Sequence, residues 1–174
     1  EAVREFEVAV GIDPNNANAN RLLALSPAKT GDLDKAVEYG LKAVQIEPSY
    51  AIHYVMGLIY SNQDKLDKAG ESYKQALQFS PKSYEAWHQL GKVYATTLDF
   101  DKAVEAYQEA VKLNPRFPDA FQGLGSAYYW SGNLTAALQQ VDALDKLGFS
   151  GKAAELKRWI KDKETKKKKS EKKT

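Results

Sequence analysis

Apolar residues recur along the chain at helical spacing, and short polar turns separate the segments that carry them. In the stretch RLLALSPAKTGDLDKA, residues 21–36, the first residues have the pattern of an amphipathic helix and the last six that of a turn and a new helix start. A similar turn, SGNL, occupies residues 131–134. The residues placed to cap the helix after such turns are Asp32, Asp99 and Asn133. The pattern predicts pairs of helices joined by short turns.

Proline marks an internal repeat. Four prolines follow one another at intervals of 34, 33 and 34 residues, at Pro14, Pro48, Pro81 and Pro115. Alanine stands twelve and again five residues before each of them, and an aromatic residue stands eight before in most copies. Small residues at fixed positions let two helices approach closely, large aromatic residues fill the gaps, and proline ends the second helix. Because no such unit can bury its apolar face alone, we expect the units to stack.

The third copy of the repeat is nearly complete, with Trp87, Leu90, Gly91, Tyr94, Ala103, Tyr107, Ala110 and Pro115. This pattern resembles the tetratricopeptide repeat. The resemblance implies an all-α fold, a right-handed superhelix (α-solenoid) of antiparallel helix pairs whose first helices line a concave groove. Residues 1–14 would be the second helix of a truncated repeat, and residues 15–148 four full repeats. The pentatricopeptide family, which binds RNA and has a similar period, fits the pattern less well.

The first full repeat departs from the others. Pro27 stands where the other repeats have tyrosine, Asn20 where the third has tryptophan, and Ala24 where they have glycine. A proline in a helix interior removes a backbone donor and costs about 3 kcal/mol. We therefore expect the helical hydrogen bonding to be interrupted between Leu23 and Lys29, either as drift tolerated at the end of an array or as a hinge beside the groove.

After the fourth repeat, an apolar stripe at helical spacing predicts a capping helix over residues 149–165; its members are Ala153, Leu156, Trp159 and Ile160. Residues 166–174 are lysine-rich and lack apolar surface, which predicts a disordered basic tail. The alternative is an arm that binds nucleic acid or an anionic membrane. The absence of interleaved aromatic residues disfavours nucleic acid, and the small apolar face of the capping helix disfavours a membrane-surface helix.

The composition argues against several classes of function. No run approaches the 18 or more apolar residues of a membrane span. The absence of cysteine excludes disulfides and zinc–thiolate sites. His53 and His88, the two histidines, lie on the first helices of adjacent repeats but lack the further ligands of a metal site. We therefore predict a protein that is not an enzyme and has no cofactor or metal.

The candidate binding site is the face beside the buried stripe of each first helix. Its residues are Tyr54, Leu58, Asn62, Glu85, His88, Gln89, Lys92, Gln122, Ser126, Tyr129 and Trp130. The family resemblance implies that this face holds an extended peptide or a helix of a partner protein. We expect Tyr129 to line the groove. For Trp130 two placements stay open, the groove and a contact with the capping helix near Trp159.

One use of this fold, the carboxylate clamp for chaperone C-termini, needs a ring of lysine, arginine and asparagine. Arg21 fits the first place of that ring, but Leu25, Val55, Glu85 and Gln89 occupy the others. We therefore do not expect chaperone C-termini as ligands.

The leading function is a scaffold for protein–protein interaction whose partner is a protein or peptide. Self-association, with the open face of the first repeat stacked on another copy, is the alternative and would make a homo-oligomer. The chain starts inside an apparent helix, so we expect it to be a fragment whose N-terminal targeting segment, if there is one, lies outside the sequence. The cytoplasm is the default expectation for its compartment.

Overall fold

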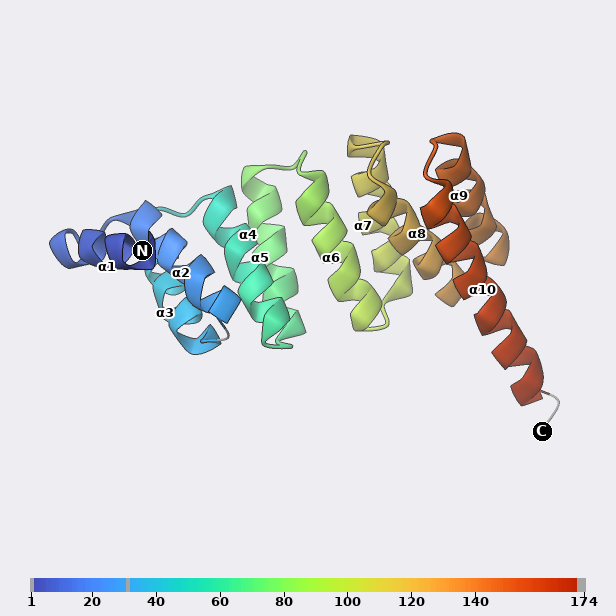
Figure 1. Ribbon diagram of the computed structural model, residues 1–174, viewed down its shortest axis with the longest axis horizontal. Helices are drawn as coiled ribbons and strands as arrows, with labels where there is room; N and C mark the ends of the chain where they lie inside the picture. The colour runs from blue at the N-terminus through green and yellow to red at the C-terminus, as the bar shows by residue number, and fades with distance from the viewer. Residues whose placement is uncertain (1, 31, 172–174) are drawn as a thin grey trace. The chain divides into compact units, whose positions relative to one another are not determined.

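The computed structural model describes residues 2–30 and 32–171, and most of them are helical (Figure 1). The helices are α1 (Ala2–Ile12), α2 (Ala17–Thr30), α3 (Leu33–Ile46), α4 (Tyr50–Asn62), α5 (Leu66–Phe79), α6 (Tyr84–Thr96), α7 (Phe100–Leu113), α8 (Pro118–Trp130), α9 (Leu134–Lys146) and α10 (Ser150–Glu171). These residues include no strand. The predicted all-α fold of paired helices is confirmed.

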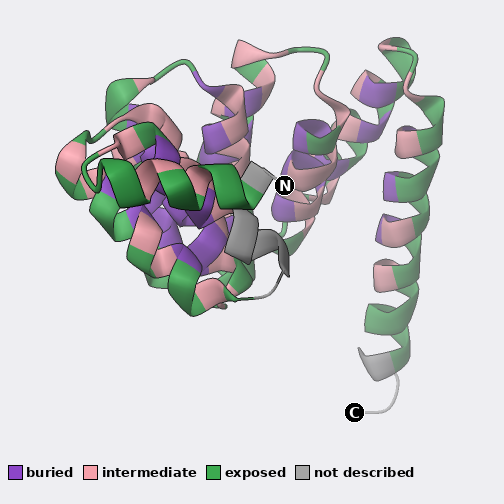
Figure 2. Cartoon of the chain, turned by 60° about the vertical axis from the view of Figure 1, so that its left-hand side comes forward, coloured by how far each residue is buried: buried purple, intermediate pink, exposed green. Residues whose placement is uncertain are grey.

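The chain divides into two compact units, residues 1–86 and 87–174, and the boundary falls in the first turn of α6. In the N-terminal unit, α1 packs on α2, α2 pairs with α3, and α4 pairs with α5. In the C-terminal unit, α7 packs on α8, α8 pairs with α9, and α10 contacts both α8 and α9. Figure 2 shows buried residues on the sides of these helices that pack together, and residues 165–169 of α10 are exposed.

The predicted caps are present at three helix starts. The carboxylates of Asp32 and Asp99 accept hydrogen bonds from the backbone N–H of Lys35 and Lys102, and the Asn133 side chain accepts one from Ala136. Each bond satisfies a backbone donor that the first turn of a helix leaves without an intrahelical acceptor.

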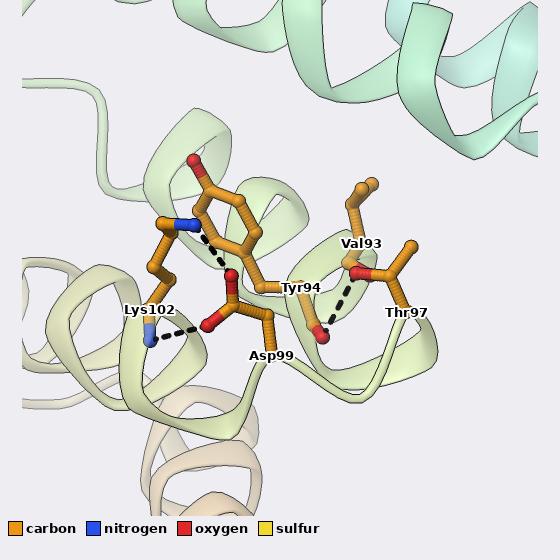
Figure 3. Close-up of polar contacts among 5 residues, drawn as sticks. All are labelled: Val93, Tyr94, Thr97, Asp99 and Lys102. Carbon is orange, nitrogen blue, oxygen red and sulfur yellow. Dashed lines mark hydrogen bonds and ion pairs between the residues drawn. The ribbon is translucent and has the colours of Figure 1, made fainter.

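The turn between α6 and α7 combines such a cap with a second set of contacts (Figure 3). The hydroxyl of Thr97 donates to the carbonyl oxygens of Val93 at 3.2 Å and Tyr94 at 3.1 Å, which closes the end of α6. The ammonium of Lys102 pairs with Asp99 and lies 5.7 Å from the centre of the Tyr94 ring. The turn therefore holds the two helices of this repeat through exposed contacts as well as through the core.

Glycine and tyrosine meet where the helices of a repeat approach most closely. A Cβ atom at Gly57 in α4 would lie 2.4 Å from Tyr73 Cε1 in α5, and one at Gly91 in α6 would lie 2.8 Å from Tyr107 Cδ1 in α7. Tyr73 is fully buried and Tyr107 nearly so. Because real Cβ atoms do not come so close to a ring, only glycine fits these two places.

The first full repeat solves the same packing problem differently. The tyrosine of the other repeats is replaced by Gly40 in α3, and the sulfur of Met56 in α4 lies 2.2 Å from the position of a Cβ there. Methionine fills irregular gaps well because its side chain is unbranched and flexible. Ala24, fully buried, takes the place of the glycine in α2.

Asn20 is fully buried although it stands where the third repeat has tryptophan. Its side-chain nitrogen donates to the carbonyl oxygen of Pro14 at 3.1 Å and to that of Asn16 at 2.9 Å. The amide therefore ties the turn between α1 and α2 to the first turn of α2. A hydrogen-bonded polar side chain thus replaces a large apolar one in this repeat.

The predicted interruption of the helix between Leu23 and Lys29 is wrong. The α2 helix continues through Pro27 and ends at Thr30. Since Pro27 is three residues from the end of the helix, it removes one backbone donor in the last turn, while the preceding turns keep their hydrogen bonds. Leu23, one helical turn before Pro27, is buried, and the packing of α2 on α3 stabilises the helix up to that point. The side chains of residues 26–31 lie outside the described residues.

The last helix, α10, runs from Ser150 to Glu171 and so extends past the boundary predicted at residue 165. Residues 166–171, expected to be disordered, are helical, and residues 172–174 lie outside the described part. Lysine is a good helix former, and lysines in the last turn interact favourably with the helix dipole. Among the described helices, none has the length and apolar character needed to cross a membrane.

A leucine in the turn between α6 and α7 leads to a first prediction. Leu98 has φ +63° and is 72% exposed, whereas Gly132 has φ +88° at the corresponding place before α9. A left-handed conformation costs a non-glycine residue about 1–2 kcal/mol. We expect Leu98→Gly to raise the free energy of unfolding by about 0.5–1 kcal/mol, less than that cost because glycine also gains entropy in the unfolded chain.

Chemical denaturation of the purified variants measures this change, and Gly132→Leu is the matched control. It imposes the left-handed conformation on leucine and should lower the free energy of unfolding by about 1 kcal/mol. A lower midpoint for Leu98→Gly would show that the Leu98 side chain makes a stabilising contact that outweighs its backbone strain.

Candidate functional site

The predicted site residues of α4 lie in the N-terminal unit and differ in exposure. The ring of Tyr54 stacks on Tyr50 with the centroids 5.6 Å apart and meets Tyr73 edge-on at 5.8 Å. Leu58 is half-buried and Asn62 is exposed in the last turn of the helix. Tyr54 therefore belongs partly to the core of its unit, while Asn62 is open to solvent.

Glu85 takes part in the cap of α6. Its carboxylate accepts a hydrogen bond of 3.0 Å from the hydroxyl of Ser83, which also lies 2.8 Å from the Tyr50 hydroxyl. Ser83 in turn accepts a hydrogen bond from the backbone N–H of Ala86 at 3.1 Å. This network gives Glu85 a structural partner in addition to its place on the predicted face.

His88, on α6 in the C-terminal unit, is held between two aromatic rings. Its imidazole centroid is 4.9 Å from that of Phe117 and 5.7 Å from that of Tyr107. Burial, together with the positive charge of Lys92, lowers the pKa of His88 to about 4, and the negative charge of Asp119 opposes this shift. The ring is therefore neutral near pH 7. The remaining predicted residues of α6 differ in exposure: Gln89 is half-buried and Lys92 is exposed.

A pocket of about 500 Å³ lies between α8 and α10 in the C-terminal unit. It is lined by Gln122, Gly123, Ser126, Glu155, Leu156, Arg158, Trp159 and Asp162. Two of the predicted site residues, Gln122 and Ser126, thus belong to its α8 wall.

Hydrogen bonds and ion pairs fix the polar end of this pocket. The side-chain amide of Gln122 donates to the Glu155 carboxylate at 3.1 Å and to the backbone carbonyl of Lys152 at 3.4 Å. The Lys152 ammonium lies 3.4 Å from an oxygen of Asp119 and 3.6 Å from one of Glu155. These contacts join the first two turns of α8 to α10 across the pocket.

The two predicted aromatic residues at the end of α8 both contact α10. The Tyr129 ring lies 5.3 Å from Trp159, and the Trp130 ring lies 6.0 Å from Trp159 and 6.0 Å from Phe100. Trp130 nevertheless remains 47% exposed, and Tyr129 is half-buried. Of the two placements open for Trp130, the structure has the one near Trp159, and Tyr129 shares that contact.

The sequence interpretation treated α10 only as a capping helix and so missed the α10 wall of the pocket, with Glu155, Arg158, Trp159 and Asp162. A signal was present in the spacing. The sequence placed Trp159 in the stripe of α10, but only Ala153, Leu156 and Ile160 are buried, and Trp159, at the edge of the stripe, is half-buried. A tryptophan at the edge of a stripe is available to line a surface.

His53, in the N-terminal unit, stacks on Phe79 with the centroids 5.6 Å apart. Burial lowers its pKa. In residues 2–30 and 32–171, no three side chains of histidine, aspartate and glutamate gather as a metal site would require. His53 also borders a second, mostly apolar pocket of about 250 Å³, whose other lining residues are Leu41, Val44, Met56, Tyr60, Lys68, Glu71, Ser72 and Gln75.

Comparison with known families agrees with this architecture. One model, described as "TPR repeat", matches residues 57–97 and 99–132, and another, described as "Tetratricopeptide repeat", matches residues 1–51. The chain belongs to the tetratricopeptide-repeat family. Domains of this family are typically non-enzymatic interaction modules, so the protein has the fold of a scaffold for protein–protein interaction.

The individual proteins that this tetratricopeptide-repeat protein resembles have identities of 30% or less over the parts compared. Hsp70-Hsp90 organizing protein 3 of Arabidopsis thaliana is 30% identical over 86 residues, which are 49% of this chain but 15% of that protein. The crystal structure of MamA is 26% identical, with a TM-score of 0.77 over 92% of this chain and 90% of that one. YrrB, described as a TPR protein with an unusual peptide-binding site, is similar in fold, with 21% identity and a TM-score of 0.77 over 90% and 82% of the two chains.

The burial of His88 predicts a dependence of stability on pH. The unfolded chain takes up a proton at His88 near pH 6.5, whereas the folded chain takes it up only near pH 4. Its contribution to stability is therefore complete above pH 6.5 and is lost as the pH falls to about 4. The wild type should lose free energy of unfolding between pH 6.5 and pH 4, and about 1–2 kcal/mol of this loss should be absent in His88→Phe. This figure is discounted because the ring is partly exposed.

Denaturant unfolding at a series of pH values from 7 to 4 tests this expectation. His53→Phe is the matched control and should change the slope less, because His53 is the less buried of the two rings. If the free energies of unfolding of the wild type and His88→Phe change in parallel with pH, the imidazole takes up its proton at the same pH in the folded and unfolded chains.

Proposed function

We propose that this tetratricopeptide-repeat protein binds an extended or helical segment of a partner protein in the pocket between α8 and α10. The observation that carries the proposal is the composition of the pocket walls. Leu156 and Trp159 offer apolar surface, Gln122 and Ser126 offer hydrogen-bonding groups, and charges of both signs stand at the rim. A site with an apolar floor and a few placed polar groups is typical of specific ligand recognition.

The size of the pocket suits side chains of a peptide. Ligand sites are commonly about 300–1,000 Å³, and this one is about 500 Å³. The Gln122 amide, already oriented by Glu155 at 3.1 Å, offers its carbonyl oxygen to a backbone N–H of a bound segment. The half-buried Trp159 adds an aromatic surface of the kind that dominates binding energy at interfaces.

The named relatives support protein partners in general. The Arabidopsis protein is, by its name, an organizer of two chaperones, and YrrB is described as having a peptide-binding site. Against chaperone C-termini as the ligand of this chain stand Leu25 and Val55, which occupy places that the carboxylate clamp gives to polar or basic residues. We therefore propose a partner segment of a different kind.

Blocking the pocket tests the proposal. Segments that bind the full chain are first selected from a random peptide library, and their dissociation constants are measured by fluorescence polarisation. Ser126→Arg places a long charged side chain on the α8 wall, and we expect it to weaken binding at least about thirtyfold, the loss typical of a central interface contact. Gln139→Arg, exposed on α9, introduces the same side chain outside the pocket and should change the constant less than about twofold.

Two outcomes would contradict the proposal. If the library yields no segment that the full chain binds above background, the pocket is not a peptide site. If Ser126→Arg and Gln139→Arg weaken binding equally, the added charge and not the blocked pocket accounts for the loss.

Self-association is a second candidate, favoured by the exposed apolar residues of α1. Val8 and Ile12 stand one helical turn apart, and their side chains are 61% and 81% exposed. Neighbouring apolar side chains on one helical face, open to solvent, are typical of a contact surface.

If α1 mediates such contact, the average mass of the full chain should rise with protein concentration, and Ile12→Glu should keep it at the monomer value. Light scattering over a hundredfold range of concentration measures the mass. Leu41→Glu on α3, where the side chain is 47% exposed, is the matched control and should leave association unchanged. A wild-type mass that stays at 19.4 kDa throughout would exclude this function.

A further inference from the structure

Three aromatic rings meet at the end of α8 and form a corner in the C-terminal unit. Tyr129, Trp130 and Trp159, here called the aromatic corner, lie with their ring centroids 5.3–6.0 Å apart and their planes 75–77° from one another. Trp130 also stacks on Phe100 of α7 at 6.0 Å and 19°. Because the three rings contact one another across α8 and α10 and Trp130 also contacts α7, the corner is formed before any ligand arrives.

A positive charge already lies at this corner. The ammonium of Lys163 is 5.0 Å from the centre of the Trp130 ring and 5.6 Å from that of the Trp159 ring. The face of an indole ring is negative, so a cation within about 6 Å of it is attracted. Two indole rings therefore share one ammonium, and the structure marks the point at which both attract a cation.

Lys163 reaches this point because it continues the stripe of α10. It follows Ile160 by three residues and Trp159 by four, which places it on the same side of the helix one turn later. A lysine ammonium is compact and strongly hydrated, whereas a guanidinium is planar, less hydrated and stacks on aromatic rings. A guanidinium should therefore bind the two indole rings more tightly than the Lys163 ammonium that occupies the corner.

One carboxylate contacts the corner, and two more line the adjoining pocket. The Tyr129 pKa is raised by partial burial, by its hydrogen bond to Glu164 and by the charge of that carboxylate. Trp159 is also a wall of the pocket that Glu155 and Asp162 border, with Arg158 as the opposing charge. Lys152 already pairs with Glu155, so a cation that replaces Lys163 on the two indole rings has Glu164 and Asp162 as its nearby carboxylates.

We propose that the aromatic corner binds the guanidinium of an arginine in the partner segment, which displaces the ammonium of Lys163. The proposal rests on the proposed function, because it identifies one residue of the segment that the neighbouring pocket would hold. Trp159 joins the two sites, since it is a wall of the pocket and one ring of the corner. Lys163 is then an internal competitor that sets the affinity for arginine.

The experiment titrates the full chain with the tripeptide acetyl-Gly-Arg-Gly-amide and follows tryptophan fluorescence, since two of the three tryptophans form the corner. Lys163→Met removes the competitor and should strengthen binding about 3- to 30-fold, the range that cation–aromatic contacts span. Lys161→Met is the matched control. It removes the same charge from an exposed position on the same helix and should change the affinity less than about twofold.

Loss of the corner should abolish the response. Trp130→Leu removes a ring that is partly exposed, so circular dichroism should show a folded protein, while the arginine tripeptide should bind at least about tenfold more weakly. The tripeptide with glutamine in place of arginine should give no saturable change.

Several results would overturn the proposal. Equal strengthening by Lys163→Met and Lys161→Met would reduce the effect to net charge. Saturable binding of tetramethylammonium without binding of the arginine tripeptide would make the corner a site for quaternary ammonium groups instead. Because a tripeptide is too short to fill the pocket, its titration and the binding of the library segments are separate measurements, and the two proposals can therefore fail separately.

Discussion

The close contact between a glycine of one helix and a tyrosine of the next is the constraint on which the stacking depends. The Tyr107 ring lies 2.8 Å from the position of a Cβ at Gly91, in its own repeat, and 2.5 Å from that at Gly123, in the following repeat. One buried ring thus fills the space on both sides of α7. A buried aromatic side chain removes about 150–250 Å² from water, and no helix pair could bury such a ring by itself.

The two ends of the array meet the same constraint with other side chains. In the first full repeat the large residue comes from the neighbouring helix, where Met56 fills the space at Gly40. At the other end Leu156 of α10 lies 2.6 Å from the position of a Cβ at Gly125. The last repeat is therefore closed by an aliphatic side chain in the place where a further repeat would supply its own, and α10 is held close to α8.

This closure also creates the candidate site. Because Leu156 holds α10 against α8, the residues beside it on α10 face those of α8 across the pocket. The stripe of α10 ends in Lys163, whose long side chain lies along the apolar surface while its ammonium reaches the indole rings. The site that we propose and the capping of the repeat array thus use the same helix, with its stripe turned to the core and the flanking residues to the ligand.

The sequence by itself determined the helix pairs, their caps and the glycine places, because each is a local or periodic property. Asp99 stands at a fixed distance from the start of α7, and Gly91 recurs in register with Gly57. The sequence did not determine where the side chains outside the apolar stripes lie. The burial of His88 against Phe117, the contact of Trp130 with Trp159 and the α10 wall of the pocket all depend on which element packs beside another. Pro27 shows the same limit, since a rule about isolated helices predicted a break in a helix that packing against α3 stabilises.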